Sequence, residues 1–267
     1  MMMTLIQALP VFLLMFCRIT SFFIVAPLIS SRNVPTQFKI GLATIVAILV
    51  YLSYGTNQTA AFDGSYVLLI VREILIGLML GYIGNLILTA IQISGAILDI
   101  QIGFGMATVF DPTTGAVTPL TGQFKYMIAM LIFLSMNGHH RLLDAIVYSY
   151  NWVPLDNELF VEIYNGNLTE FMLKAFASAM IIAFQMAAPI VVAIFLTDVG
   201  LGFLAKTAPQ FNIFVIGIPI KIIVGLILLL LLMPSLTYIF DHLFSLMAET
   251  MQGLLGTVGE RPTSSGR

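Results

Sequence analysis

The sequence predicts an all-α, polytopic integral membrane protein. Of its 267 residues, 59% are hydrophobic and 9% are charged, whereas soluble domains carry about 25% charged residues. The mean hydropathy is +1.02, and six apolar segments divide the chain. Two Gly- and Pro-containing stretches of mixed polarity interrupt the pattern, so we expect broken helices that pack into a helical multi-subunit assembly rather than a set of equal lipid-facing rods.

The six apolar segments follow one another with polar connections of unequal length. The first, 5–29, has no basic residue before it and no cleavage pattern after it, so we expect a retained membrane segment rather than a signal peptide. The remaining segments, in order, are 38–52, 66–97, 124–135, 171–196 and 213–240. Of the six, the second (38–52) and the fourth (124–135) look short for a membrane span, and the third (66–97) looks long.

Composition and motif searches exclude several function classes. A net charge of −2 argues against nucleic-acid binding, and the single cysteine, Cys17, excludes an intramolecular disulfide. His139, His140 and Asp144 lie close in sequence but lack a further ligand for a metal site. No phosphate-binding, metalloprotease or hydrolase motif occurs in the chain. We therefore expect a protein that is not an enzyme and needs no cofactor or metal.

Small residues at four-residue spacing predict close helix packing. Gly77 and Gly81 form a G-x-x-x-G pair, and Gly84 lies on the edge of the same face. A second row of small side chains comprises Ala175, Ala179, Ala183 and Ala187. Small residues on one helix face let backbones approach closely where lipid supplies no hydrophobic drive.

The stretch 99–122, DIQIGFGMATVFDPTTGAVTPLTG, predicts an irregular but apolar loop. Its four glycines and two prolines disfavour a long helix, and no Lys or Arg occurs between Arg72 and Lys125. Irregular backbone at membrane depth requires surrounding protein or a water-filled path. The loop is therefore a candidate plug or constriction, and an interfacial re-entrant connector is the alternative.

The stretch 206–221, KTAPQFNIFVIGIPIK, predicts a broken helix with an interaction site. Its two prolines remove backbone donors, and Gln210, Asn212 and Lys221 replace the apolar side chains of a simple membrane helix. We expect these polar groups to bond freed backbone groups or another subunit.

Charged residues inside apolar segments need partners, and in an assembly we expect most of those partners on other subunits. Arg72 and Glu73 are adjacent, so different helix faces and different partners are expected for them. Arg141 and Asp144 are three apart and could pair locally. A proton relay through Glu73 or Asp99 is a further alternative.

These features together resemble the FliR family of type III export-gate proteins, over about residues 18–225. The densest match is Ala208-Pro209-Gln210-x-Asn212-x-Phe214, followed by Gly217, Pro219 and Lys221. Lys206 departs from the arginine more usual in the family, and lysine lacks the planar bidentate fork of arginine. The other matching positions, in order, are Ala26-Pro27, Val34-Pro35, Glu73, Gly77, Gly81, Gln92, Gly95, Gly103, Asp111-Pro112, Gly138-His139, Ser149, Pro154 and Ala188-Pro189.

The resemblance implies a role as well as a fold. A FliR-like chain would assemble in the bacterial inner membrane, at the flagellar basal body, with FliP-like and FliQ-like subunits beside FlhB and FlhA. Together they would form a channel for unfolded rod, hook and filament proteins. The resemblance divides the chain into a FliP-like part (1–170), a FliQ-like hairpin (171–260) and a disordered tail (261–267).

The same resemblance assigns residues to two sites. The plug would include Gly103, Phe104, Gly105, Met106, Phe110, Asp111 and Pro112. The subunit interface would include Glu73, Gly77, Gly81, Lys206, Pro209, Gln210, Asn212, Pro219 and Lys221. A self-contained secondary transporter, built from broken helices around a midplane site, is the alternative function.

Overall fold

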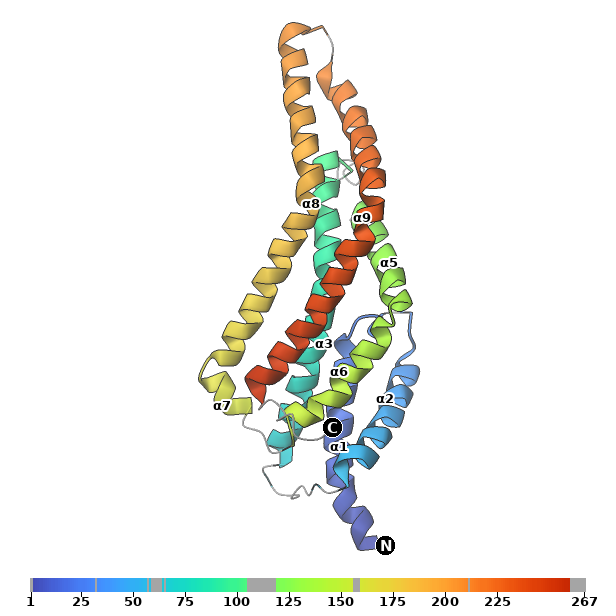
Figure 1. Ribbon diagram of the computed structural model, residues 1–267, viewed down its shortest axis with the longest axis vertical. Coiled ribbons are helices and arrows are strands. Elements are labelled where there is room, and N and C mark those ends of the chain that lie inside the picture. Colours follow the sequence, from blue (N-terminus) through green and yellow to red (C-terminus); the bar gives the residue numbers. More distant parts are fainter. Residues whose placement is uncertain are drawn as a thin grey trace. The chain divides into compact units, whose positions relative to one another are not determined.

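The computed structural model describes residues 2–31, 33–56, 58, 64, 66–104, 119–155, 159–210 and 212–259, with the side chains of 2–7 and 214 left out. Every regular element in these ranges is a helix, which confirms the all-α prediction (Figure 1). The helices are α1 (Met2–Val25), α2 (Thr36–Val50) with the π-helical turn η1 (Tyr51–Gly55), α3 (Tyr66–Ile102), α5 (Leu120–Ser135), α6 (Gly138–Trp152), α7 (Leu159–Tyr164), α8 (Asn167–Thr207) and α9 (Ile213–Val258).

Five stretches of the described chain are long and apolar enough to cross a membrane, and the protein is a polytopic membrane protein. They are Ala8–Val25, Thr36–Gly55, Tyr66–Ile102, Asn167–Thr207 and Val215–Val258. The second segment is longer than predicted because η1 extends α2, so it reaches spanning length. The fourth predicted segment, α5, stays shorter than a span.

The chain forms two compact units, and α3, α8 and α9 each contribute to both. Unit 1 comprises Met1–Leu86, Asn137–Phe176 and Phe244–Arg267. Unit 2 comprises Ile87–Met136 and Ala177–Leu243. The predicted division at residue 170 concerned likeness to FliP-type and FliQ-type chains, and it stays a prediction.

In unit 1, α1 and α3 pack with their backbones in contact, as the glycine spacing predicted. A Cβ at Gly77 would lie 2.1 Å from Ser21 Oγ and 2.2 Å from Arg18 O. A Cβ at Gly81 would lie 2.9 Å from Phe22 O. Real Cβ atoms do not reach such distances, so only glycine lets these two helices approach this closely.

In unit 2, the alanine row of α8 faces the interior. Ala179, Ala183 and Ala187 are buried, and Ala187 belongs to an apolar cluster shared by α3, α8 and α9. The other buried members of that cluster are Leu98, Ile102, Ile190, Ile194 and Leu229. The small side chains admit the larger ones of the neighbouring helices, as the four-residue spacing predicted.

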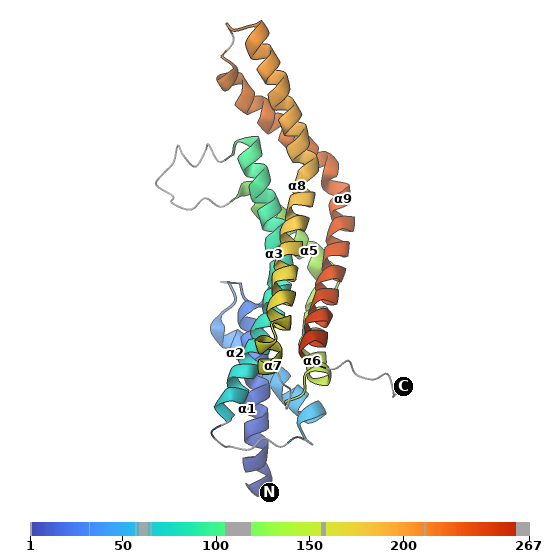
Figure 2. The same ribbon diagram turned by 90° about the vertical axis from the view of Figure 1, so that its left-hand side faces the viewer.

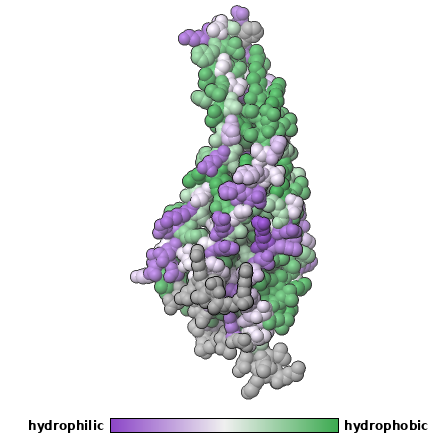
Figure 3. Space-filling model, in the orientation of Figure 1, coloured by the Kyte–Doolittle hydropathy of each residue, from purple (hydrophilic) through white to green (hydrophobic). Residues whose placement is uncertain are grey.

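The long helices α8 and α9 run antiparallel and leave much of their apolar surface uncovered (Figure 1). Only 17% of the membrane-competent stretch of α9 is buried, compared with 61% of that of α3. Hydrophobic side chains cover the hairpin at the top of the view in Figure 3. The exposed set on its upper part includes Phe195, Leu196, Phe203, Leu204, Val215, Ile216 and Ile223. This surface is suited to lipid or to other subunits rather than to water.

The Gly77 contact gives a direct stability prediction. Gly77→Ala forces a methyl group into the backbone of α1, so we expect a loss of about 1–3 kcal/mol in unfolding free energy by overpacking. Gly41→Ala in α2 is the matched control, because nothing lies within 4 Å of its Cβ position. A denaturation titration in mixed detergent micelles measures both. Equal stability of the two variants would contradict the assigned helix contact.

Candidate functional site

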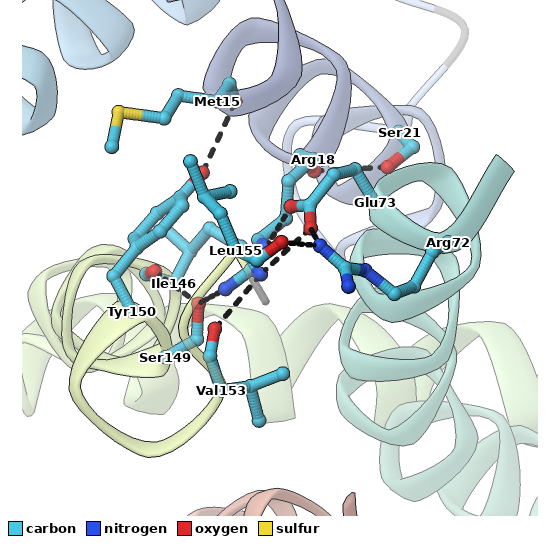
Figure 4. A network of polar contacts seen from close by, with 10 residues as sticks. All are labelled: Met15, Arg18, Ser21, Arg72, Glu73, Ile146, Ser149, Tyr150, Val153 and Leu155. Atoms are coloured by element: carbon cyan, nitrogen blue, oxygen red, sulfur yellow. Dashed lines mark hydrogen bonds and ion pairs between the residues drawn. The ribbon is translucent and has the colours of Figure 1, made fainter. Parts of the chain in front are cut away.

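Arg18 in unit 1 is fully buried, and its guanidinium joins three segments of the chain (Figure 4). Its Nε donates to Glu73 Oε2 at 2.6 Å, and one terminal nitrogen donates to Glu73 Oε1 at 3.1 Å and to Val153 O at 2.9 Å. The other terminal nitrogen donates to Ser149 Oγ at 3.1 Å. Arginine carries five N–H donors in a fixed fork, and here four bonds reach α3, α6 and the turn that follows α6.

Aromatic and basic neighbours complete this network. Arg18 lies 4.2 Å from the ring centroid of Tyr150, whose hydroxyl donates to Met15 O at 3.1 Å. Burial raises the pKa of that hydroxyl, so it stays protonated and keeps donating. Arg72 donates to Glu73 Oε1 at 3.3 Å and to Leu155 O. Two arginines thus hold one carboxylate and two backbone carbonyls.

For Arg18, Arg72 and Glu73, this arrangement corrects the expectation of partners on other subunits. Arg18 and Glu73 are both 0% exposed and pair within the chain. Adjacent Arg72 and Glu73 have the different partners that were expected, Leu155 O and Arg18, and they also contact each other at 3.3 Å. The predicted interface residues Glu73, Gly77 and Gly81 therefore lie against the protein's own α1, because that helix supplies both the arginine and the close-packing backbone.

In unit 2, the two ends of the predicted plug loop are tied together by α3 and α5. The Thr121 backbone N–H donates to the Asp99 carboxylate at 3.1 Å, and the Thr121 hydroxyl lies 2.5 Å from Asp99 Oδ1. A Cβ at Gly95 would lie 2.1 Å from Gly122 Cα, so the two helices touch there. Figure 2 shows the end of α3 and the start of α5 in this part of unit 2. We call these contacts the loop clamp.

The described residues of the predicted plug lie just outside the clamp. Gly103 ends α3 with φ +99°, a left-handed conformation that favours glycine, and its N–H donates to Asp99 O at 3.1 Å. Phe104 packs against the apolar cluster of unit 2. Gly105, Met106, Phe110, Asp111 and Pro112 lie outside the described residues, and their assignment to a plug stays a prediction.

The predicted helix break at 206–221 is confirmed in part. The chain leaves α8 at Thr207 and enters α9 at Ile213, and Lys206, Pro209, Gln210 and Asn212 are exposed around this turn. Pro219, by contrast, does not end a helix: α9 begins at Ile213 and continues through it. Lys221 pairs with Asp198 of α8 at 2.6 Å rather than with another subunit. Among the described residues of 206–221, the exposed side chains of Lys206, Gln210 and Asn212 lie around the turn.

Sequence reasoning missed the residues that complete these contacts. Arg18 lies within the first apolar segment, 5–29, and the sequence did not indicate its partner; Thr121 and the Lys125–Ser94 hydrogen bond were passed over as well. The available signal was charge balance, because Glu73 is the one acidic residue in the first half of α3. The local Arg141–Asp144 pairing was wrong, since no ion pair within 4.0 Å joins these two described residues.

A profile of the family described as "Bacterial export proteins, family 1" matches residues 9–247. The chain belongs to this family. The match includes part or all of each of the five membrane-competent stretches, and it ends within the last of them, before residues 248–258. The resemblance read from the motifs is thereby confirmed.

Several related proteins align over most of the chain. The flagellar biosynthetic protein FliR of Bacillus subtilis (strain 168) is 43% identical over 258 residues, which cover 97% of this chain and 99% of the relative. FliR of Escherichia coli (strain K12) is 31% identical, covering 92% and 91%. The Yop proteins translocation protein T of Yersinia pestis is 29% identical, covering 80% and 82%.

The Arg18 network gives the second stability prediction. Glu73→Ala leaves buried guanidinium charge without its carboxylate, so we expect a loss of about 3–5 kcal/mol in unfolding free energy. The double variant Arg18→Leu/Glu73→Ala recovers part of that loss, because one of the two guanidinium groups that Glu73 contacts is gone while Arg72 remains. Glu170→Ala, which removes an exposed ion pair with Lys174, is the control and changes little. If Glu73→Ala behaved like Glu170→Ala in an unfolding titration, the network would not hold unit 1 together.

Proposed function

We propose that the chain is a non-enzymatic core subunit of the flagellar type III protein export gate in the bacterial inner membrane. It assembles with FliP-like and FliQ-like subunits, beside FlhB and FlhA, around a channel for unfolded rod, hook and filament proteins. The full-length likeness to FliR of B. subtilis is the observation that carries this proposal. The likeness to a Yop translocation protein supports the broader class of type III export.

The structure supports the proposal through the difference between the paired buried charges of unit 1 and the exposed hairpin surface of unit 2. The buried charges Arg18, Arg72 and Glu73 of unit 1 are matched within the chain, so they need no partner on another subunit. The α8–α9 hairpin of unit 2 keeps a polar turn and large exposed apolar surfaces. If the subunit contacts other subunits through this hairpin, the polar turn and the apolar surfaces are buried together. Membrane helices associate by such close packing and interhelical hydrogen bonds.

A second part of the proposal concerns the loop between α3 and α5, which we assign as the plug of the channel. The loop clamp holds the two ends of this connection together on one side of unit 2. A long connection with fixed ends can be displaced when a substrate passes without separating α3 from α5.

Assembly is tested at the hairpin tip. Gln210 is exposed and outside both helices, so Gln210→Ala leaves the fold of the free chain intact while it removes an amide that bonds a partner. We expect the yield of co-purified complex with FliP-like and FliQ-like proteins to fall about tenfold, the effect of one buried hydrogen bond. Lys174→Ala, exposed on α8 in unit 1, is the control. Gel filtration that shows equal complex yield for both variants would count against the interface.

The plug is tested by replacing 106–117 with a short Gly-Ser linker, which the loop clamp allows because the ends stay tied. We expect the assembled complex to conduct ions across a planar bilayer without export substrate. A Gly-Ser segment of the original length separates loss of side chains from loss of length. If both replacements remained tight to ions, the connection would not be the plug.

A further inference from the structure

A furrow lies between α6 and the last turns of α9 in unit 1 and has no role in the proposed export function. It holds a cavity of about 400 Å³, within the size range of small-molecule sites. The two helices that form it lie side by side in Figures 1 and 2. Its lining combines charged side chains from α6 with apolar side chains from α9.

The charged part of the lining is a cation and an anion that do not neutralise each other. Arg141 and Asp144 are three residues apart on α6, a spacing at which opposite charges usually pair. Both are exposed, both line the cavity, and no ion pair within 4.0 Å joins them. A ligand with only one charge is attracted by one side chain and repelled by the other. A ligand that carries both charges satisfies both.

The rest of the lining is typical of the boundary between lipid chains and headgroups. Met247 and Met251 are buried, and methionine adapts to irregular apolar ligands. Tyr148 and Trp152 add an apolar body with a polar edge, the combination enriched at membrane interfaces. α6 itself buries Leu142, Ile146 and Tyr150 on one side and exposes its charged residues on the other. Such an amphipathic helix suits a position at the membrane surface.

We propose that this furrow binds a phospholipid with a zwitterionic, primary-amine headgroup, the phosphoethanolamine type. The Arg141 guanidinium takes the phosphate, and the Asp144 carboxylate accepts hydrogen bonds from the ammonium group. The upper part of an acyl chain lies on Met247 and Met251. A phosphocholine headgroup has no N–H to donate to Asp144, and a phosphoglycerol headgroup has no cation for it. The charge pattern therefore favours phosphoethanolamine over both.

The test uses Trp152, because it is the only tryptophan in the chain and lines the furrow. The purified full-length chain is placed in phosphatidylcholine vesicles with a small, fixed fraction of a lipid brominated in its acyl chains near the headgroup. Bromine quenches tryptophan fluorescence on contact. We expect brominated phosphatidylethanolamine to bind about tenfold more tightly than brominated phosphatidylcholine or phosphatidylglycerol, the effect of a charge-assisted hydrogen bond.

Two variants separate the two charges. Arg141→Gln removes the phosphate contact that all three headgroups share, so quenching by all three lipids weakens while Asp144 keeps the preference for phosphatidylethanolamine. Asp144→Asn removes repulsion of an anionic headgroup, so phosphatidylglycerol binds as well as phosphatidylethanolamine. Lys174→Gln, outside the furrow, keeps the native preference and serves as the control.

Three results would overturn the proposal. They are equal quenching by all three brominated lipids with the native chain, a preference that survives Asp144→Asn, and the absence of quenching by any of them. The measurement is repeated on the chain co-assembled with its export partners. A Trp152 that brominated lipid no longer reaches there would assign the furrow to a polypeptide instead.

Discussion

A guanidinium buried among membrane helices needs hydrogen-bond acceptors, and the packing of unit 1 depends on the acceptors that surround Arg18. An unmatched buried charge costs several kcal/mol, so the helix that carries it is stable only beside helices that supply acceptors. Glu73 on α3, Ser149 on α6 and the Val153 carbonyl all lie within 3.1 Å of the guanidinium nitrogens. One side chain thereby fixes the mutual positions of three segments that are far apart in the sequence.

The close approach of α1 and α3 and the ion pair depend on each other. Gly77 lies one helical turn after Glu73, on the same face of α3, and a Cβ there would meet Arg18 O, Ser21 Oγ and Phe22 N. A larger residue at this position would push α1 outward and lengthen the Arg18–Glu73 bonds. The glycine spacing therefore brings α1 and α3 close enough for Arg18 and Glu73 to pair. The ion pair in turn supplies an attraction between the two helices that the lipid does not supply.

The sequence predicted the helical class, the close packing at Gly77 and the break near Pro209, because composition, four-residue spacing and proline act locally. It did not predict the partner of Arg18, since Ser149 and Val153 lie more than 130 residues away and pattern carries no distance information. Pro219 suggested a second break, yet α9 continues through it because most of its backbone bonds survive. The loop clamp was missed because Thr121 and Gly122 resemble ordinary loop residues until Asp99 and Gly95 lie opposite them.

The central proposal is that Arg18, Arg72 and Glu73 stabilise unit 1 within the chain, whereas the tip of the α8–α9 hairpin binds partner subunits. Hydrogen–deuterium exchange of the purified chain, alone and co-assembled with FliP-like and FliQ-like proteins, tests it most directly. The account predicts strong protection of α1, the first half of α3 and α6 in both samples. It also predicts that protection of residues 204–217 rises only in the complex. A hairpin tip unchanged by assembly, together with a unit 1 protected only in the complex, would contradict the account.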